Sequence, residues 1–406
     1  MHSDDSEPAM VEVAVIGGGP AGLTAAIALA AAGVETGLIS APERRPDNRT
    51  TALLMGSVSA LEVLQVWKAC RPYAAPLRAI RMIDATRRLL RAPAVMFEAG
   101  EIGVEAFGHN IENRHLVAAL DARAAALAHL HRFAGPALAI DPGEHEVRVA
   151  LPGGQQVRAR LVIGADGRRS LCRQAAGIRT DGFGYEQTAL TVNLQHARPH
   201  DDVSTEFHTE TGPFTLVPLP GNRSSLVYVV SPGMAKRLKR LEAATLAAMI
   251  EQRSHSLLGL VTLEGDRGVF GLGWEQARRF AGRRIALVGE AAHVIPPIGA
   301  QGLNIGLRDA ATVAELVVAV RRRGGDIGAV GLTDQYHAAR RADVTSRSFA
   351  VDLLNRSLLS DFLPVQGARG LALYLLDRIG PLRRAVMREG MAPTLSQPRL
   401  MRGQAL

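Results

Sequence analysis

Aromatic residues, cysteine and lysine are scarce in this chain. Phe, Trp and Tyr make up 4% of its 406 residues, which argues against a protein that stacks single-stranded nucleic acid on aromatic side chains. The two cysteines, Cys70 and Cys172, form no Cys-x-x-Cys or Cys/His ligand spacing, so neither a metal site nor a disulfide scaffold is indicated. No apolar run approaches the ~18 residues of a membrane-spanning helix, and the acidic start does not resemble a secretory signal. We therefore expect a cytoplasmic protein that lies, at most, peripherally on the inner face of the cytoplasmic membrane.

The positive charge of the chain comes almost entirely from arginine. Lys and Arg together number 47 against 39 Asp and Glu, a net charge of +8, and only Lys68, Lys236 and Lys239 are lysines. Two interpretations stay open: the charge is spread over a solvated surface, or it favours an anionic surface or cofactor. We do not expect nucleic acid as a partner. The length indicates two to three domains.

A glycine-rich turn follows the first expected strand, residues 11–16. Gly17, Gly19 and Gly22 form the pattern G-x-G-x-x-G, and an apolar helical segment follows. In this strand–turn–helix context Gly17 makes the tight turn, Gly19 lets a pyrophosphate approach the backbone, and Gly22 lets the helix pack on the strand. We expect the helix N-terminus around Ala21 to hold the diphosphate of a dinucleotide.

The second expected strand ends in Ser40, where dinucleotide-binding folds usually carry an acidic residue for the adenosine ribose. Arg44 and Arg45 follow shortly, and a missing acid with nearby arginines can indicate the 2′-phosphate of NADP. Glu43 offers another contact to the ribose diol. On this segment alone, FAD and NADP both stay open.

A strand at 161–167 reads LVIGADG and ends in Asp166-Gly167 before an expected helix. Either Asp166 contacts the cofactor, or it only caps that helix.

A later strand ends in Gly289-Glu290 and leads through a Pro/Gly-rich loop into a long amphipathic helix. Backbone N–H groups of Gly302, Leu303 and Asn304 lie at the start of this helix, where they would stabilise the negative charge of a reduced flavin. This pattern favours FAD.

Three of these motifs resemble those of the single-component flavoprotein aromatic hydroxylases: the first glycine turn, Asp166-Gly167, and GEAAHVIPPIGAQGLN at 289–304. The resemblance covers nearly the whole chain. It implies tight, non-covalent FAD, NAD(P)H as co-substrate, and aromatic hydroxylation with O2. The family usually carries Gly-Asp in the late motif, whereas Gly289-Glu290 must accommodate one more methylene.

Further stretches resemble the ubiquinone-biosynthesis hydroxylase subgroup: DNRTTALLMGSVSALEVLQVW, GPFTLVPLPGNRSSLVYVV and GEAAHVIPPIGAQGLNIGLRD. This implies a polyprenylated phenol or quinol as substrate, and contact with the membrane and with other ubiquinone-biosynthesis proteins. A homo-oligomer stays open. So do two other functions: hydroxylation of a soluble aromatic compound, and a flavoprotein lipid reductase or a non-catalytic NADP-binding subunit.

The resemblance also implies roles for individual residues. Arg49 would contact the flavin, Asp166 and Glu290 the FAD, and Pro297 the flavin edge where oxygen reacts. The candidate polar groups near the substrate, each of which also suits a structural role, are His293, Gln301, Tyr185, Tyr228 and His208.

The predicted architecture is α/β, with a discontinuous Rossmann-like FAD-binding domain at 8–75, 105–185 and 268–340. A β-sheet substrate domain at 76–104 and 186–267 would roof the flavin, and 341–406 would form a helical C-terminal region. In the sheet, Phe214, Leu216 and Pro218 would form either an apolar wall facing the substrate ring or a plain core strand.

The C-terminal region has an amphipathic pattern with two interpretations: its helices lie on an anionic lipid surface, or they pack on the flavin domain with a solvated basic face. The residues concerned are Leu371, Leu375, Leu382, Val386, Arg369, Arg378, Arg383, Arg384 and Arg388.

Overall fold

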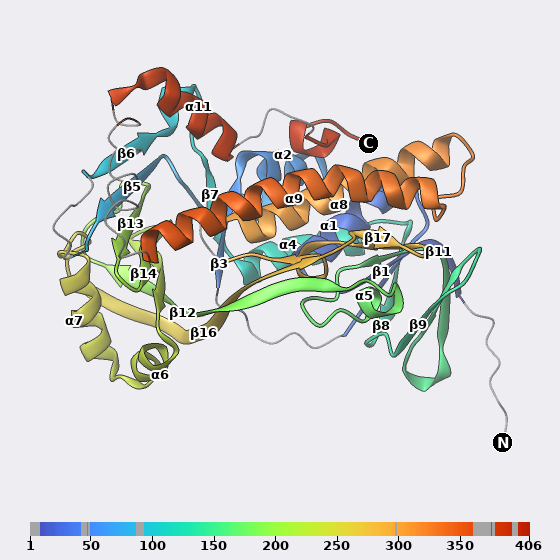
Figure 1. Ribbon diagram of the computed structural model, residues 1–406, viewed down its shortest axis with the longest axis horizontal. Coiled ribbons are helices and arrows are strands. Elements are labelled where there is room, and N and C mark those ends of the chain that lie inside the picture. The colour runs from blue at the N-terminus through green and yellow to red at the C-terminus, as the bar shows by residue number, and fades with distance from the viewer. Residues whose placement is uncertain are drawn as a thin grey trace.

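The computed structural model describes residues 9–41, 47, 49–86, 93–296, 299–359, 375, 378–391 and 397–406, with side chains except at 348–359 and 391. Two sheets build the body, and the long helix α9 (Val330–Leu359) runs along both of them (Figure 1).

The first sheet has parallel central strands. Its order is β17-β18-β11-β1-β2-β8, with β10 beside β11 and β9 beside β10. β1 pairs in parallel with β2 and β11, and residues 13–16 of β1 are all buried, as a central parallel strand requires. The strands are β1 (Ala9–Ile16), β2 (Thr36–Ser40), β8 (Leu130–Ala134), β9 (Ala139–Pro142), β10 (Val147–Ala150), β11 (Gln156–Gly164), β17 (Ala281–Gly282) and β18 (Ile285–Leu287).

Helix α1 (Pro20–Ala31) packs between this sheet and two other helices, α4 (Asn113–Ala125) and α8 (Gln301–Arg322). Residues 22–30 of α1 are all buried, because their small side chains let neighbours approach closely from several directions. Pro20 stands at the first helical position, where its missing N–H costs nothing.

The second sheet is largely antiparallel, in the order β19-β16-β12-β15-β14-β13-β5-β6. Its strands β12 and β16 are long and extend from this sheet toward the first one (Figure 1). The strands are β5 (Ala79–Asp84), β6 (Val95–Glu98), β12 (Thr180–His196), β13 (Val203–Thr209), β14 (Gly212–Leu219), β15 (Arg223–Val230), β16 (Val261–Ala277) and β19 (His293–Val294).

A small sheet, in the order β3-β7-β4, lies beside the second one. Thr50 Oγ1 is 2.7 Å from Ser225 Oγ, and Asn193 Nδ2 donates to Glu112 at 3.0 Å, so these bonds join the two sheets. The remaining elements are β3 (Thr50–Leu54), β4 (Ala74–Pro76), β7 (Gly108–Glu112), α2 (Met55–Val63), α3 (Trp67–Cys70), η1 (Arg71–Tyr73), η2 (Ala99–Ile102), η3 (Pro152–Gly154), α5 (Leu171–Ala175), α6 (Pro232–Arg240), α7 (Ala243–Arg253), η4 (Gly289–Ala291), α11 (Gly380–Met391) and η5 (Arg399–Arg402).

The two faces of the second sheet have different neighbours. Successive residues of a strand point to opposite faces. In β14, Thr215 and Val217 line a large cavity, whereas Phe214 and Leu216 join a core with residues of α6 and α7. Of the two interpretations of this strand, the structure therefore shows the core strand. Phe214 and Leu216 pack in the core, Pro218 is not among the lining residues of the cavity, and the other face of the strand meets the cavity.

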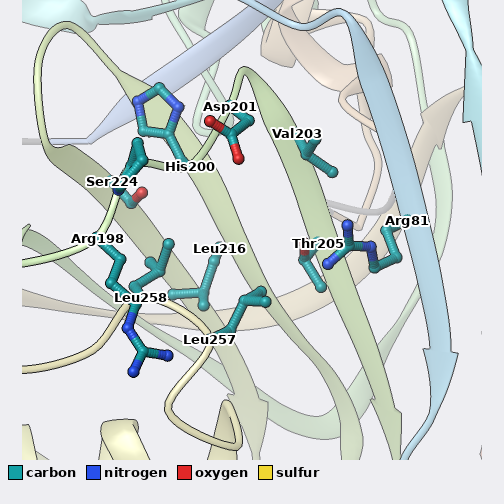
Figure 2. A pocket seen from close by; sticks show the side chains of 11 residues that line it. Arg81, Arg198, His200, Asp201, Val203, Thr205, Leu216, Ser224, Leu257 and Leu258 are labelled. Carbon is teal, nitrogen blue, oxygen red and sulfur yellow. The ribbon is translucent and has the colours of Figure 1, made fainter.

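A second, smaller hollow lies on the core side of this sheet (Figure 2). It measures about 300 Å³, and Arg81, Thr205, Leu216 and Leu258 are among its lining residues. The large cavity is lined by the adjacent positions of the same strands, such as Ile80. The sheet therefore separates the two spaces.

The α/β class is confirmed, with a Rossmann-like half, a sheet-based half and C-terminal helices. The exact domain boundaries stay a prediction, because β12 and β16 run continuously across two of them. Among the described helices, none has both the length and the apolarity needed to cross a bilayer.

Candidate active site

A cavity of about 1210 Å³ lies where the two halves meet. Chain segments of the first half that line it include Gly19–Gly22 and parts of 47–54, 110–118, 165–168 and 288–306. One face of the second sheet closes it on the opposite side. Segments far apart in the sequence thus converge on one space.

The three glycines of the first turn have different surroundings, and therefore different roles. A Cβ on Gly17 would lie 2.1 Å from the carbonyl oxygen of Ala165, and one on Gly22 would lie 2.0 Å from that of Gly17. Both positions are therefore fixed by backbone packing. A Cβ on Gly19 would meet no protein atom within 4 Å, and Gly19 lines the cavity. The open room beside Gly19 is where a ligand can approach the backbone.

Two helix N-termini point at the cavity. α1 begins after Gly19 and α8 after Ala300, and neither cap residue makes a side-chain cap hydrogen bond. Ala21, Gly22, Gly302 and Leu303 line the cavity at these ends. Free N–H groups and the helix dipole make both ends favourable to negative charge.

The side chain of Asn304 is occupied within the protein. Its Oδ1 accepts from Leu54 N at 2.9 Å and from Ser57 Oγ at 2.7 Å, while its Nδ2 donates to the carbonyl oxygens of Ala52 and Ala300. Asn304 therefore ties the start of α8 to β3 and α2. Asn304 is not among the lining residues of the cavity, so the predicted contact of its backbone N–H with a ligand stays a prediction.

Arg49 and Glu290 both line the cavity. The guanidinium of Arg49 bonds the carboxylate of Asp47 through Nε and Nη2, both at 2.8 Å, and stacks 4.9 Å from the ring centre of Phe270. The hydrogen bonds that Arg49 donates to Asp47, opposed by burial and assisted by the charges of Asp47 and Glu290, raise the pKa of Arg49 above its ordinary value. A Cβ added to Gly289, where φ is +60°, would lie 3.4 Å from the Cβ of Ala21, so the turn that carries Glu290 lies beside the first glycine turn.

Asp166 caps a helix. Its Oδ1 accepts from Ser170 Oγ at 2.6 Å and its Oδ2 from Cys172 N at 3.0 Å. Ala165, Gly167 and Arg168 line the cavity, but Asp166 is not among the lining residues. Of the two interpretations of Asp166, the structure shows the capping role, and a direct contact with the cofactor stays a prediction.

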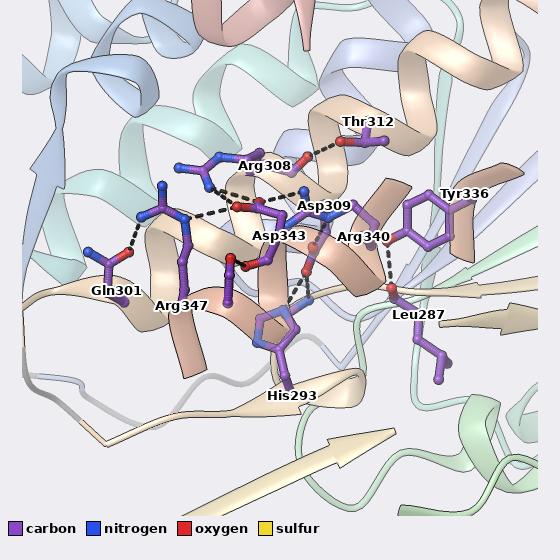
Figure 3. A network of polar contacts seen from close by, with 12 residues as sticks. Leu287, His293, Gln301, Arg308, Asp309, Thr312, Tyr336, Arg340, Asp343 and Arg347 are labelled. Carbon is purple, nitrogen blue, oxygen red and sulfur yellow. Dashed lines mark hydrogen bonds and ion pairs between the residues drawn. The ribbon is translucent and has the colours of Figure 1, made fainter. Parts of the chain in front are cut away.

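Gln301 also faces the protein. Its Nε2 donates to the carbonyl oxygen of Gly299 at 3.1 Å, and its Oε1 accepts from Arg347 Nη1 of α9 at 3.0 Å (Figure 3). The side chain thus fixes the first turn of α8 to α9. This geometry does not favour the catalytic role that the sequence suggests for Gln301.

His293 belongs to a buried ionic network around Asp309 (Figure 3). The carboxylate of Asp309, with no exposed surface, lies 2.7 Å from Nε2 of His293 and accepts from Arg340 Nε at 2.6 Å and Gly289 N at 3.0 Å. Burial alone would raise the pKa of Asp309, but the charges of His293 and Arg340 hold it below its ordinary value. Asp309 therefore locks the turn at Gly289 in place as a carboxylate.

The network continues along α9. Arg340 Nη1 donates to Asp343, which also accepts from Arg308 at 2.8 Å and Arg347 at 2.9 Å. Burial opposes ionisation of Asp343, but the guanidinium groups of Arg340 and Arg308 lower its pKa well below the usual range. Sequence reasoning missed this network. The feature of the sequence that could have indicated this network is an acidic residue, Asp309, within the buried stripe of α8.

His293 lines the cavity as well. Its Nδ1 is buried and has no hydrogen-bond partner among the residues that the structure describes, so this atom can still bond a ligand.

Five predicted positions remain without a shown role. Ser40 ends β2, and it is not among the lining residues of the cavity. Glu43, Arg44, Arg45 and Pro297 lie outside the described residues, so their proposed contacts stay predictions.

The profile of the FAD binding domain family matches residues 10–347. Ubiquinone hydroxylase UbiL of Rhodospirillum rubrum is 36% identical over 414 residues, covering 98% of this chain and 94% of that protein. The 3-demethoxyubiquinol 3-hydroxylase of Escherichia coli is 31% identical, covering 93% and 97%. In structure, p-nitrophenol 4-monooxygenase PnpA from Pseudomonas putida is similar with a TM-score of 0.75, 22% identity and coverage of 94% and 96%.

The chain therefore belongs to the FAD-binding family of flavoprotein aromatic hydroxylases. It is an FAD-dependent monooxygenase that takes NAD(P)H as co-substrate.

Proposed function

We propose that this enzyme hydroxylates the aromatic ring of a polyprenylated phenol or quinol in ubiquinone biosynthesis. Relatives that match over nearly their whole length carry ubiquinone-hydroxylase names. The observation that carries the proposal is the single cavity, which joins the flavin-binding segments to a sheet face and to an apolar end. Contact with other ubiquinone-biosynthesis proteins remains a part of this proposal that rests on the relatives alone.

The residues present fit an FAD. The open backbone at Gly19 and the uncapped start of α1 suit its pyrophosphate. Arg49 and Glu290, which both line the cavity, offer a cation and a hydrogen-bond acceptor to the ribityl and flavin groups. The N–H groups of Gly302 and Leu303 suit the pyrimidine end of the flavin ring.

Bound FAD supplies the redox chemistry, taking a hydride from NAD(P)H and activating O2. The protein's part is to hold charge and to exclude water. The start of α8 stabilises negative charge on the flavin, and the Asp309 network fixes the distance between that helix and the Gly289 turn. The second sheet covers the cavity and so limits the entry of water.

The sheet face opposite the flavin segments carries small polar and apolar side chains. Thr191, Thr215 and Ser225 present hydroxyl groups to the cavity, and Val217 and Val227 present methyl groups. Hydroxyls that accept or donate a bond suit the oxygen atoms of a phenol, and the methyl groups suit its ring. This face supports a substrate ring lying between the sheet and the flavin.

An apolar end of the cavity supports the prenyl group. Leu77, Ile80 and Phe107 line it there, and Phe107 and Ile80 belong to a hydrophobic cluster that includes Ala99 and Phe97. Apolar walls stabilise an isoprenoid chain by removing its surface from water, at about 25 cal/mol per Å². A small soluble phenol would leave this end unfilled.

Val217→Trp tests the substrate face. The larger side chain fills the cavity opposite the flavin segments, so hydroxylation is expected to fall roughly a hundredfold through misplacement of the ring, while bound FAD stays at the wild-type level. Steady-state kinetics and flavin absorbance measure the two effects. Val330→Trp, at a site with 72% exposure, is the matched control and keeps full activity. A Val217→Trp enzyme with unchanged kcat/KM would contradict this placement of the substrate.

The proposed function is tested with purified enzyme and a deletion strain. Oxidation of NAD(P)H is expected to be tightly coupled to hydroxylation of a prenylated phenol and poorly coupled with the same phenol lacking its chain. The strain is expected to accumulate a quinone precursor that lacks one hydroxyl group. A normal quinone profile in the deletion strain, together with equal coupling for both phenols, would refute the proposal.

A further inference from the structure

A row of paired side chains crosses the cavity face of the second sheet and includes a carboxylate. Glu206 of β13 pairs with Thr215 of β14. Thr215 pairs with Val227 of β15, and Val227 pairs with Thr191 of β12. All four residues line the cavity, and side chains at paired positions lie on the same face of a sheet. Glu206 therefore lies on the face that we assign to the substrate ring.

Among the described residues, three carboxylates line the cavity, and Glu206 is the one that belongs to the second sheet. The guanidinium of Arg49 binds Asp47 through two hydrogen bonds of 2.8 Å. Glu290 lies in the turn beside the first glycine turn. Both of these carboxylates come from segments of the first half. Glu206 is therefore the carboxylate available to a substrate group on the sheet.

His208 holds the carboxylate of Glu206 in place. The two residues lie two positions apart on β13, so their side chains point to the same face. Nε2 of His208 lies 2.7 Å from Oε1 of Glu206. Because an ionised carboxylate only accepts hydrogen bonds, Nε2 carries the proton and donates it. The imidazole is 3% exposed and the carboxylate side chain 18%, so His208 is a positioning residue that acts on the cavity through Glu206.

The other carboxylate oxygen of Glu206, Oε2, can accept a further hydrogen bond. Thr215 Oγ1 lies 3.5 Å from it, which is long for a hydrogen bond between two oxygen atoms. No other hydrogen bond to this atom is found within the part of the chain that the structure describes. A hydroxyl group that donates to a carboxylate forms one of the stronger hydrogen bonds in proteins. With Val217 and Val227 on the same face, the surroundings suit an aromatic ring that carries a hydroxyl group.

We propose that Glu206 is a catalytic residue whose Oε2 binds the ring hydroxyl of the substrate and takes its proton as oxygen is transferred to the ring. This inference rests on the proposed function, because it requires a phenol or a quinol. The O–H bond of the substrate breaks, its electron pair stays on the oxygen, and the proton moves to the carboxylate. As the ring gives electron density to the incoming oxygen, its hydroxyl becomes more acidic, so a carboxylate is a sufficient base.

The proton returns to the same oxygen of the product, which leaves Glu206 as a carboxylate for the next turnover. NAD(P)H supplies the two electrons of the reaction. One atom of O2 becomes the new ring hydroxyl, and the other leaves as water. The carboxylate is thus neither consumed nor oxidised, and its effect is on the rate.

Glu206→Gln tests this role in the FAD-loaded full chain. The amide keeps the shape of the side chain and still accepts a hydrogen bond from His208, but it cannot take a proton. Hydroxylation of a prenylated phenol at neutral pH is expected to fall roughly a hundredfold, while circular dichroism and FAD content stay at the wild-type level. Glu62→Gln, at an exposed position of α2, is the matched control and is expected to react as the wild type does.

Two further measurements separate a base from a purely structural group. Glu206→Asp keeps the charge in a shorter side chain and is expected to lose less activity than Glu206→Gln, whereas a structural role predicts the reverse order. Raising the pH toward about 10, the usual pKa of a phenol, is expected to restore hydroxylation by the Gln variant, because solvent then removes the proton. The same pH series on the wild type corrects for the titration of His208 and of Asp84, its partner on β5.

Substrate binding provides a readout that does not depend on turnover. The wild type is expected to bind the phenol about tenfold more tightly than its methyl ether, which has no proton to donate, and Glu206→Gln is expected to lose most of this preference. The inference is overturned by a Gln variant that hydroxylates like the wild type, whose slow rate does not rise with pH, or that retains the full preference for the phenol. Each of these results leaves the proposed function intact. A wild-type enzyme that hydroxylates no phenol refutes the proposed function and this inference with it.

Discussion

Gly19→Val is expected to yield a folded protein that no longer retains FAD. A side chain at this position meets no protein atom within 4 Å and the backbone has ordinary dihedral angles, φ −74° and ψ 172°, so folding is not disturbed. The added methyl groups occupy the room where the pyrophosphate must approach. We expect FAD affinity to fall by roughly a hundredfold or more, about 3 kcal/mol. Flavin absorbance of the purified variant, circular dichroism and FAD titration measure the result.

Substitutions at two other glycines are the controls for Gly19→Val. Gly22→Val drives a side chain against the carbonyl oxygen of Gly17 and is expected to prevent stable folding. Gly100→Val, where a Cβ also meets open space but outside the cavity lining, is expected to keep both fold and flavin. A Gly19→Val protein with full flavin occupancy would show that the first turn does not hold the cofactor.

Asp309→Asn is expected to be the most destabilising conservative change near the site. It removes the negative charge between His293 and Arg340, both buried. Among the described residues, the guanidinium of Arg340 then keeps Asp343 alone as an acidic partner, and Asp343 already pairs with two other arginines. Breaking a buried pair in this way costs about 3–5 kcal/mol. The Gly289 turn also loses a charged acceptor, so FAD is expected to dissociate faster. Urea unfolding and flavin release from the holoenzyme measure both effects.

The pH dependence of stability gives this prediction a direction. The fold lowers the pKa of Asp309 from 3.8, so its stabilising contribution is complete above about pH 4 and is lost as the pH falls below that value. The Asn variant is expected to lack this part of the acid sensitivity. Asp181→Asn, which breaks the exposed pair with Arg278, is the control and is expected to unfold at nearly the same urea concentration as the wild type. Equal unfolding free energies for Asp309→Asn and the wild type would contradict the role of the network.

The sequence predicted what depends on local geometry. The spacing of Gly17, Gly19 and Gly22 between a strand and a helix is sufficient to place a helix N-terminus at a phosphate site. The start of α8 was found in the same way, because its glycine-rich loop and amphipathic helix are continuous in the chain. In both cases the prediction needed no contact between distant residues.

Contacts between distant segments could not be predicted. The sequence predicts a role for the backbone N–H of Asn304 and says nothing of its side chain. In the structure the side chain accepts a hydrogen bond from the backbone N–H of Leu54, which is 250 residues away in the sequence. The sequence offers Gln301 as a candidate polar group near the substrate. Its hydrogen bond with Arg347 could not be predicted, because Arg347 lies on another helix.

For Asp166, the sequence allows both a cap and a cofactor contact. The positions of Ser170 and Cys172 show the cap, and the cofactor contact stays a prediction.

The face of the second sheet illustrates a different limit. Alternation along β14 separates Phe214 and Leu216 from Thr215 and Val217, but it does not say which set faces the cavity. The packing of α6 and α7 on the Phe214 face decides it. The sequence therefore leaves both an apolar wall and a core strand open for Phe214 and Leu216. In the structure these residues form the core, and Thr215 and Val217 line the cavity.

The central claim is that one FAD, held by the cavity-lining segments of the first half, faces a substrate ring on the second sheet. A single turnover in heavy-isotope O2 tests this claim most directly. The FAD-loaded enzyme is mixed with NAD(P)H and a prenylated phenol, and the mass of the product is measured by mass spectrometry. The account predicts a ring hydroxyl that carries a heavy oxygen atom for each NAD(P)H consumed. A product without heavy oxygen, or consumption of NAD(P)H with an unchanged phenol, would contradict it.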